Sequence, residues 1–425
     1  TAMYRRTWML GVLVLVVLLA SACQPIQRPP ASGAPVDVAK LDDAMAARID
    51  AYVTEQQDRN RVPGLAIAIV KDGQPVYERG FGVANVDSGR PVTPGTVFRL
   101  ADIAMIPTTI AVLQLVEQGK IDLDAPVTTY LPYFQLQDER YKDITVRHIL
   151  EGKSGIEDVY DIARIWDTYP VDNEEGAIER YVRGMAQPSR LFSSRLAFAP
   201  GRVFVHSYIA RIILGDIIQK VSGQSYEEYV DEHLFAPLGM EHSTFLLDAV
   251  DPALLASPHV ITEYGLAQAN IVVSDLIPFS REFAASDNLY SNAEDMSRMM
   301  AALLNGGELE GARILTPESV KLLSARSGAA LDPIQQYTWG YEHPAHLYVG
   351  YGMGSFIDEI EGCSVYHLFG LQLGYRANIM LCPDQKLGVV LMGNRGQNER
   401  LTPGGDEFYA NEMLPDLMSM LLGAE

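Results

Sequence analysis

An acidic residue, Asp102, stands within the stretch FRLADIAMIPTT (residues 98–109), directly before a segment with helical apolar spacing. A carboxylate there could act as a nucleophile if a neighbouring group activated it. It could also cap the free N–H groups at the start of the helix, where the helix dipole favours an acid, and we expect this capping role. Because Pro107 disfavours an unbroken helix, we expect the helix to begin near Ile106 or to kink there, which would displace residues 102–105.

The rest of the chain shows strand patterns near both ends and helical patterns between them. GLAIAIVKDGQPVYERGFGVAN contains two β-rich runs around a Lys-Asp-Gly turn at 71–73, and CSVYHLFGLQLGYRANIMLCPDQKLGVVLMGN contains strand runs joined by glycine turns. Helical segments are expected at residues 39–57, 108–118, 147–151, 208–221, 226–234, 291–307 and 407–423. This arrangement predicts an α+β fold in one unit, residues 40–425, with a sheet assembled from the two termini.

The order and spacing of several motifs resemble the serine β-lactamase and penicillin-binding protein family with its related esterases, most closely the class C-like branch. The resemblance covers nearly all of residues 40–422. Its motifs are VPGLAIAIVKDGQPVYERGFGVAN, LQLVEQGKIDLDAPVTTYLP, VRHILEGKSGI, AFAPGRVFVHS, GQSYEEYVDEHLFAPLGMEHSTF, LYSNAEDMSRMMAALLNGG and PDQKLGVVLMGNRG. It implies a β-lactamase/transpeptidase-like fold: an antiparallel sheet built from both chain ends, flanked by helices, with a mainly helical region between.

Three clusters carry the chemistry of that family, and the resemblance places all three on altered residues in this chain. They are Ser-x-x-Lys, Tyr-x-Asn and a Lys/His-x-Gly strand motif, which supply the nucleophile, a proton shuttle and part of the oxyanion site. In that order, their positions hold Asp102 and Met105, His206 and Tyr208, and Leu368 and Gly370. The positions of an expected Gly-Gly pair and of a frequent His-Thr pair hold Asp287-Asn288 and Gly152-Lys153. No Ser-x-x-Lys occurs elsewhere in the 425 residues.

These substitutions predict that the family chemistry is lost. Met105 cannot activate a carboxylate at residue 102. His206 could serve as a base or a metal ligand, but with Asp102 and Tyr208 as its cleft companions it falls short of the ligands that zinc needs. We therefore expect neither a metal nor a cofactor. His367 should face the opposite side of its strand from Leu368 and have a structural role.

The replacements in the expected cleft exchange groups that handle charge for apolar or aromatic ones. Such a cleft would exclude an oxyanion. It is either filled like a core or forms a groove for an apolar ligand or peptide. The replacing residues are Met105, Tyr208, Leu368, Phe369, Leu371 and Leu373, with Asp287 and Asn288 also lining the cleft.

The N-terminus predicts export and membrane attachment. Two arginines precede the apolar run WMLGVLVLVVLLASAC, which is typical of a secretory signal, and its end resembles a bacterial lipoprotein signal with Cys23 as the lipidated residue. Residues 1–23 are thus either a signal peptide or a retained anchor, although the run is shorter than a bilayer core. Residues 24–39, rich in Pro, Ser and Gly, are expected to be a flexible linker.

An exported protein meets oxidising conditions, so Cys363 and Cys382 could form a disulfide. The family comparison places them on two antiparallel strands with the turn near Gln372. They would then lie nearly opposite each other, at a Cα separation of ~4.5–5.5 Å.

Composition narrows the choice of function. The net charge of −21 argues against nucleic acid as a partner, since phosphate binding needs basic patches. Our preferred hypothesis is a catalytically inactive protein of this family, held at the outer face of a membrane as a binding, scaffold or accessory subunit in an envelope complex. The alternatives are a family hydrolase for esters or peptidoglycan-type amides with an atypical site, and a small-ligand sensor or carrier.

Overall fold

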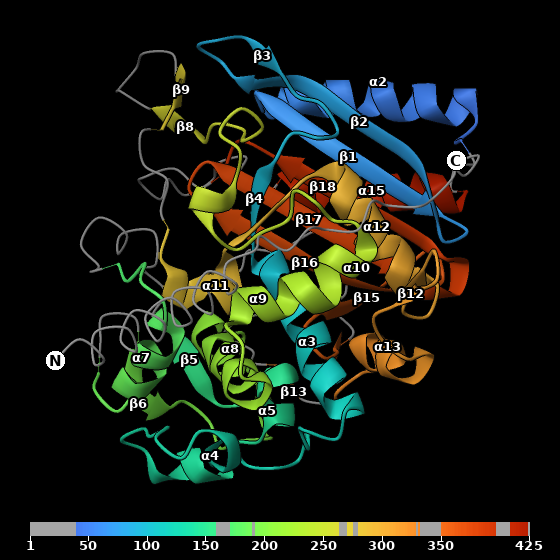
Figure 1. The fold of residues 1–425 in the computed structure, drawn as a ribbon. Helices are drawn as coiled ribbons and strands as arrows, with labels where there is room; N and C mark the ends of the chain where they lie inside the picture. Colours follow the sequence, from blue (N-terminus) through green and yellow to red (C-terminus); the bar gives the residue numbers. More distant parts are fainter. Residues whose placement is uncertain are drawn as a thin grey trace, which may run out of the picture. The chain divides into compact units, whose positions relative to one another are not determined.

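The central feature of the fold is an eight-stranded sheet in which strands from both ends of the chain pair with one another (Figure 1). The computed structural model describes residues 40–158, 171–188, 192–262, 270–274, 279–328, 330–331, 350–396 and 409–423. In spatial order the strands are β14 (Gly350–Tyr351), β15 (Phe356–Ile360), β16 (Cys363–Gln372), β17 (Tyr375–Cys382), β18 (Leu387–Gly393), β1 (Gly64–Lys71), β2 (Gln74–Asn85) and β3 (Arg90–Pro91). All of their described pairings are antiparallel. The predicted α+β fold with a sheet from both termini is confirmed.

Alternating side chains of this sheet pack into two separate hydrophobic cores, one on each face. Ile67 and Ile69 of β1 pack on one face with the helices α2 (Asp43–Arg59) and α15 (Tyr409–Leu422). Ala66 and Ala68 belong to the core on the other face, which contains most of the remaining helices. Because helices cover both faces, β1 is apolar along nearly its whole length and does not alternate with polar residues.

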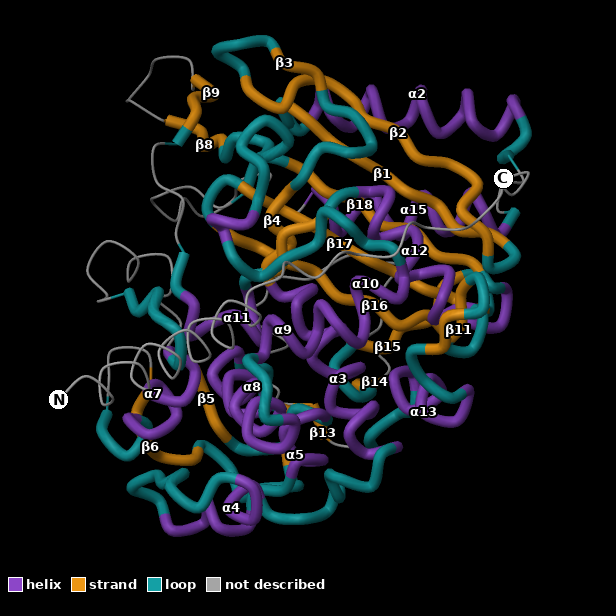
Figure 2. Tube along the Cα trace, viewed as in Figure 1, coloured by secondary structure: helices purple, strands orange, loops and turns teal. Residues whose placement is uncertain are grey.

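The helical region lies between the strands in sequence and packs mainly against one face of the sheet; in Figure 2 most helices lie below the strands. The predicted helices are found, with small shifts at their ends. The helices of this region are α3 (Met105–Glu117), α4 (Val127–Tyr130), α5 (Val146–Leu150), α7 (Ala177–Gly184), α8 (Tyr208–Ser222), α9 (Tyr226–Val230), α10 (Ala236–Leu238), α11 (Ala284–Asp287), α12 (Ala293–Leu304) and α13 (Pro317–Ser324). Of these, α4, α7, α10, α11 and α13 were not expected from the sequence.

Short two-stranded sheets join loops of the helical region. They pair β4 (Phe98–Ala101) with β10 (Leu289–Ser291), β5 (Ile156–Asp158) with β6 (Phe192–Leu196), β7 (Val203–Phe204) with β13 (Ala330–Leu331), β8 (His259–Thr262) with β9 (Asn270–Val273), and β11 (Glu308–Leu309) with β12 (Ala312–Arg313). The β4–β10 pair matters most for the candidate site, because β4 leads directly into residue 102.

The disulfide between Cys363 and Cys382 is present, as predicted, but its geometry differs from the expected one. The β16–β17 register pairs Gln372 with Tyr375, so the turn is Leu373-Gly374 and not centred on Gln372. This shift places the two cysteines diagonally across the strands. Their Cα atoms are accordingly 6.2 Å apart, still within the range of protein disulfides.

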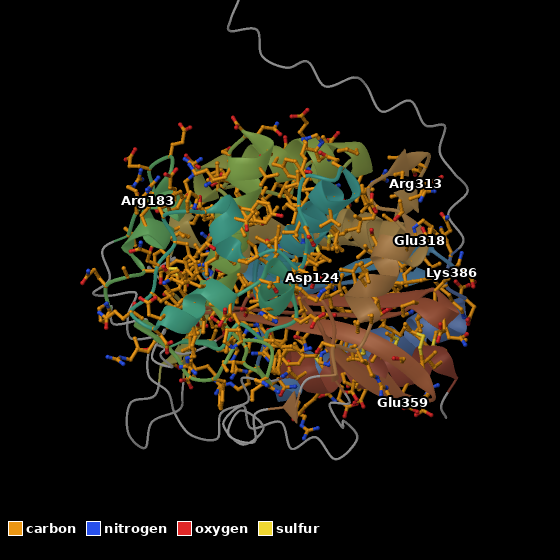
Figure 3. The ribbon with its side chains drawn as sticks, turned by 90° about the horizontal axis from the view of Figure 1, so that it is seen from below. Asp124, Arg183, Arg313, Glu318, Glu359 and Lys386 are labelled. Atoms are coloured by element: carbon orange, nitrogen blue, oxygen red, sulfur yellow. A yellow bond between two sulfur atoms is a disulfide. The ribbon has the colours of Figure 1, made fainter. Side chains whose placement is uncertain are left out.

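Charged side chains on the outer elements pair with one another. Arg183 on α7 and Arg313 on β12, both labelled in Figure 3, form ion pairs with Glu179 and Glu308. Such exposed pairs contribute little to stability. In the described part of the chain, no helix is both long and apolar enough to span a bilayer. The residues of the predicted signal, the linker up to residue 39 and Cys23 lie outside the described ranges.

Candidate active site

The residue directly before Asp102 has a strained backbone conformation. Strand β4 ends at Ala101, whose φ of 49° and ψ of −123° are rarely adopted by a residue with a side chain. The pairing of Ala101 with Leu289 in β10 holds this conformation. Gly370 of β16 packs directly over it, since a Cβ atom at residue 370 would overlap the carbonyl oxygen of Leu100. The glycine that the family motif retains thus allows β16 to approach β4 closely.

The helix start confirms one sequence-based expectation, a beginning near Ile106, and contradicts the other, a capping role for Asp102. Residues Asp102–Ala104 form a 3₁₀ turn, and α3 follows from Met105. The two N-cap positions are Ala101 and Ala104, neither with a side-chain cap, so the prediction that Asp102 is an N-cap was wrong. Pro107 is the third residue of α3, within the first turn, where an N–H group has no intrahelical partner to lose. It therefore leaves Asp102 against β16 rather than displacing it.

The Asp102 carboxyl is buried at 2% exposure between the helix start and strand β16. Burial raises its pKa from 3.8 to about 8, against the opposing effects of hydrogen bonds from the backbone N–H groups of Leu371 and of Asp102 itself and of the charges on Arg376 and Arg99. Its Oδ1 atom lies 3.9 Å from Nε2 of His206 and has no hydrogen-bond partner among the described residues. At neutral pH this carboxyl is therefore mostly in its neutral acid form.

The residues at the lysine position and at the Lys/His strand position form an apolar wall. Met105 has 0% exposure and Leu368 has 1%, and both belong to the large core on the helical face of the sheet. Neither side chain can carry a proton or a positive charge. A nucleophile at residue 102 therefore has no base at either position.

His206 and Tyr208 lie at the start of α8, around the N-cap Ser207. Burial lowers the pKa of His206 to about 4, so the ring is neutral at pH 7. Asp158, at the end of β5, accepts hydrogen bonds from Ser207 Oγ at 2.7 Å and Tyr208 N at 2.6 Å. This residue was not identified from the sequence. Its carboxyl satisfies the N-terminus of α8. The sequence signal that could have identified Asp158 is an acidic residue at the end of a predicted strand, as in SGIED.

An aromatic cluster centred on Phe356 of β15 fills the space beside His206. The Phe356 ring stacks on His206 at 6.0 Å, on Phe369 at 5.5 Å and on His367 at 5.7 Å between ring centroids. Phe204 contacts it edge-on at 5.8 Å. Phe356 itself had not been identified from the sequence.

The β16–β17 register shows which strand residues share a face. His367 pairs with Met380, which packs in the core beside α15, and Leu368 pairs with Ile379, which packs in the core on the helical face. By alternation Phe369 and Leu371 share the face of His367. They therefore do not line the cleft from the Leu368 side, and Phe369 reaches the site through Phe356. Leu373 lies in the hairpin turn.

Asp287 and Asn288 form a second buried polar cluster beside Asp102. Arg99 of β4 bonds to Asp287 Oδ2 at 2.8 Å and to Asn288 Oδ1 at 2.7 Å. Gln372 donates to the same Asp287 oxygen at 2.5 Å. Burial raises the pKa of Asp287 to about 7, with Arg99 lowering it and Asp102 raising it. Asp287 and Asn288 thus place a carboxyl and an amide group where the family has two glycines. Their partners Arg99 and Gln372 were not identified from the sequence.

Among the described residues, the positions that correspond to the family's catalytic groups hold no nucleophile paired with a base. Asp102 is mostly protonated, His206 is neutral, and Met105 and Leu368 are apolar. No group of three metal-ligating side chains occurs within the described ranges.

A sheet from both chain ends, with a helix start packed against strand β16, is the architecture of penicillin-recognising serine hydrolases. The family model for beta-lactamase matches residues 49–411, and the chain belongs to this family.

Relatives of several kinds support the assignment. Penicillin-binding protein 4 of Amycolatopsis lactamdurans is 26% identical over 378 residues, which cover 88% of each chain. Esterase EstB of Burkholderia gladioli is 33% identical over 230 residues, 52% of this chain and 56% of EstB. Protein flp of Staphylococcus aureus is 25% identical over 356 residues, 84% of this chain and 64% of flp.

Solved structures agree with the fold. The octameric penicillin-binding protein homologue from Pyrococcus abyssi has a TM-score of 0.70 at 25% identity, covering 89% of this chain and 77% of that one. D-amino acid amidase from Ochrobactrum anthropi SV3 also has a TM-score of 0.70, at 18% identity, covering 90% and 99%.

Proposed function

We propose that this chain is a catalytically inactive member of the beta-lactamase family that is held at the outer face of a membrane and acts there as a binding, scaffold or accessory subunit. The observation that carries the proposal is Asp102. The family's serine position holds a buried carboxyl that is mostly protonated at pH 7, and the lysine position holds the apolar Met105. A neutral acid without a base is neither a nucleophile nor a proton acceptor.

Purified protein tests the inactivity. We expect no hydrolysis of nitrocefin or p-nitrophenyl esters, and no labelling by a fluorescent penicillin or a fluorophosphonate, above the level of Asp102→Ala. Glu359→Ala, an exposed change on β15, serves as the control for handling. Steady turnover that Asp102→Ala abolishes and Glu359→Ala preserves would overturn the proposal.

Membrane attachment rests on the N-terminal sequence pattern. Mass spectrometry of the native N-terminus distinguishes its two modes, because a diacylglyceryl group on Cys23 marks a lipoprotein and an intact apolar segment marks a retained anchor. A protein cleaved elsewhere and released into solution would contradict both. Purification from native membranes, followed by identification of the co-purifying proteins, tests the accessory role.

A second candidate function is favoured by the buried carboxyl that Asp102 places at the family's serine position. The chain would then be a hydrolase for esters or peptidoglycan-type amides that uses Asp102 as its nucleophile. Because the pKa of Asp102 is raised to about 8, such an activity would require the ionised carboxylate and would increase as the pH rises through 8. Turnover with that pH profile would support this candidate over the first.

A further inference from the structure

A small cavity lies at the end of the large sheet opposite to the candidate active site. Its volume is about 280 Å³, and three charged side chains line it, those of Lys71, Asp72 and Glu361. Lys71 and Asp72 belong to the end of β1 and the turn that follows it, and Glu361 lies in the turn between β15 and β16. Cys363, the first residue of β16, also lines the cavity, whereas Gly370 of the candidate active site lies near the other end of that strand. The cavity is therefore separate from the site of the proposed function.

The strand order makes this cavity long and narrow. The strands β16, β17, β18 and β1 are neighbours in the sheet, and Gln385, between β17 and β18, lines the cavity between its two charged ends. Lys71 and Glu361 are thus separated by at least three strand spacings, ~14 Å along the sheet. The cavity volume is just below the ~300–1,000 Å³ of sites for drug-sized ligands. Over this length, such a volume suits a single unbranched chain.

The middle of the cavity has an apolar wall on the side of α15. Ile69 of β1 packs in the core on the α15 face of the sheet, and by alternation Lys71 points to the same face. Leu387 of β18 and the two leucines at the end of α15, Leu421 and Leu422, line the cavity on this face. These side chains can bury the methylene groups of a ligand that spans the cavity.

The three charges of the cavity are not neutralised by the protein. Lys71, Asp72 and Glu361 form no side-chain hydrogen bond or ion pair with any residue that the structure describes, whereas exposed charges on α7 and β12 are paired. The neighbouring Lys386 does not neutralise them, since its Nζ atom donates to Asn305 Oδ1 at 3.4 Å. Helix α15 ends at the cavity without a basic residue in its last turn, so its last carbonyl groups favour a cation. One end of the cavity therefore presents both signs of charge, and the other end is negative.

We propose that this cavity is a binding site for a free basic α-amino acid such as lysine. The α-carboxylate of the ligand pairs with Lys71, and its α-ammonium group pairs with Asp72. Its methylene chain lies on the leucines, and the ammonium group at the end of that chain pairs with Glu361. Each charge of the cavity thus meets the opposite charge, and the net charge of +1 on the ligand balances that of −1 on the three side chains. The inference goes beyond the proposed function and does not depend on it.

Saturation-transfer NMR titrations of the purified protein with L-lysine test the inference, and two incomplete ligands show which charges matter. Norleucine has the same head group and chain but lacks the terminal ammonium, and 1,5-diaminopentane lacks the carboxylate. We expect saturable binding of lysine and weaker binding of both incomplete ligands. Glu361→Gln should weaken lysine binding about two- to fivefold, as for the loss of an exposed ion pair, and leave norleucine binding unchanged. Lys71→Gln should weaken lysine binding to a similar extent without weakening the binding of 1,5-diaminopentane.

Glu318→Gln is the matched control, because it removes the same charge from an exposed residue in the first turn of α13, outside the cavity (Figure 3). Its affinity for lysine should equal that of the wild type. The inference is overturned if the wild type shows no saturable binding of lysine, if norleucine binds as tightly as lysine, or if Glu318→Gln and Glu361→Gln weaken the binding of lysine equally. Hydrolysis of nitrocefin by the wild type would overturn the proposed function alone, since the cavity does not include the family's catalytic positions.

Discussion

Replacing Asp102 with asparagine should stabilise the protein by an amount that grows with pH. Burial raises the pKa of this carboxyl from 3.8 to about 8, so the unfolded chain loses its proton first. The stability of the folded protein is therefore greatest below pH 3.8, where both the folded and the unfolded chain hold this proton. It falls as the pH rises towards 8, because only the unfolded chain loses the proton over this range. Above pH 8 both states are ionised and the loss stops growing. At about 1.4 kcal/mol for each unit of difference in pKa, the wild type loses on the order of 5 kcal/mol over this range, and Asp102→Asn does not.

Urea denaturation followed by circular dichroism between pH 4 and pH 9 measures this difference. The two proteins should have similar free energies of unfolding near pH 4, and at pH 7 Asp102→Asn should exceed the wild type by up to roughly 4 kcal/mol. Asp124→Asn is the control, because Arg147 lowers the pKa of the exposed Asp124 carboxyl and its loss cannot stabilise the protein at high pH. Equal stability of Asp102→Asn and wild type at every pH, or a variant that weakens as the pH rises, would refute the reasoning.

Three further outcomes are expected. The double variant Asp102→Ser with Met105→Lys should still hydrolyse little or no nitrocefin, because Leu368 remains at the strand position; robust turnover would show that the rest of the site is competent. Phe356→Ala removes the ring at the centre of the aromatic cluster and should lower the free energy of unfolding by roughly 3 kcal/mol in urea titrations, a loss that an unchanged midpoint would contradict. Asp287→Ala leaves a buried guanidinium without its carboxylate and should cost about 3 kcal/mol, whereas a melting temperature equal to that of wild type would show the pair to be unimportant.

Local sequence patterns were enough to predict the longest helices and the central strands of the large sheet. The Asp72-Gly73 pair, with positive φ at both residues, closes the β1–β2 hairpin that was expected there. Asn292 caps α12 through its side chain, and Asn is among the preferred N-cap residues. These features depend on neighbours within a few residues, which the sequence displays directly.

The details of the site depended on contacts between distant segments. Arg99 and Asp287 are 188 residues apart, and nothing in the periodicity of either segment indicates that they meet. The charge of Arg376, on β17, lowers the pKa of the Asp102 carboxyl, and no local pattern indicates that these two residues act on each other. The diagonal placement of the cysteines follows from a turn one residue later than expected, since a small shift in register moves every pair along the strand.

The position of β1 between β2 and β18 also governs when this protein can fold. The register joins Leu65 to Gly393, so the partner on one side of β1 leaves the ribosome roughly 330 residues later. At ~5–20 residues per second, the growing chain spends tens of seconds with that edge of the β1–β2 hairpin unpaired. An open strand edge is prone to pair with other chains. A chain truncated before β18 would therefore be prone to aggregate and would not be a folded half of the protein. Removing the sheet strands near either terminus would disrupt the entire fold.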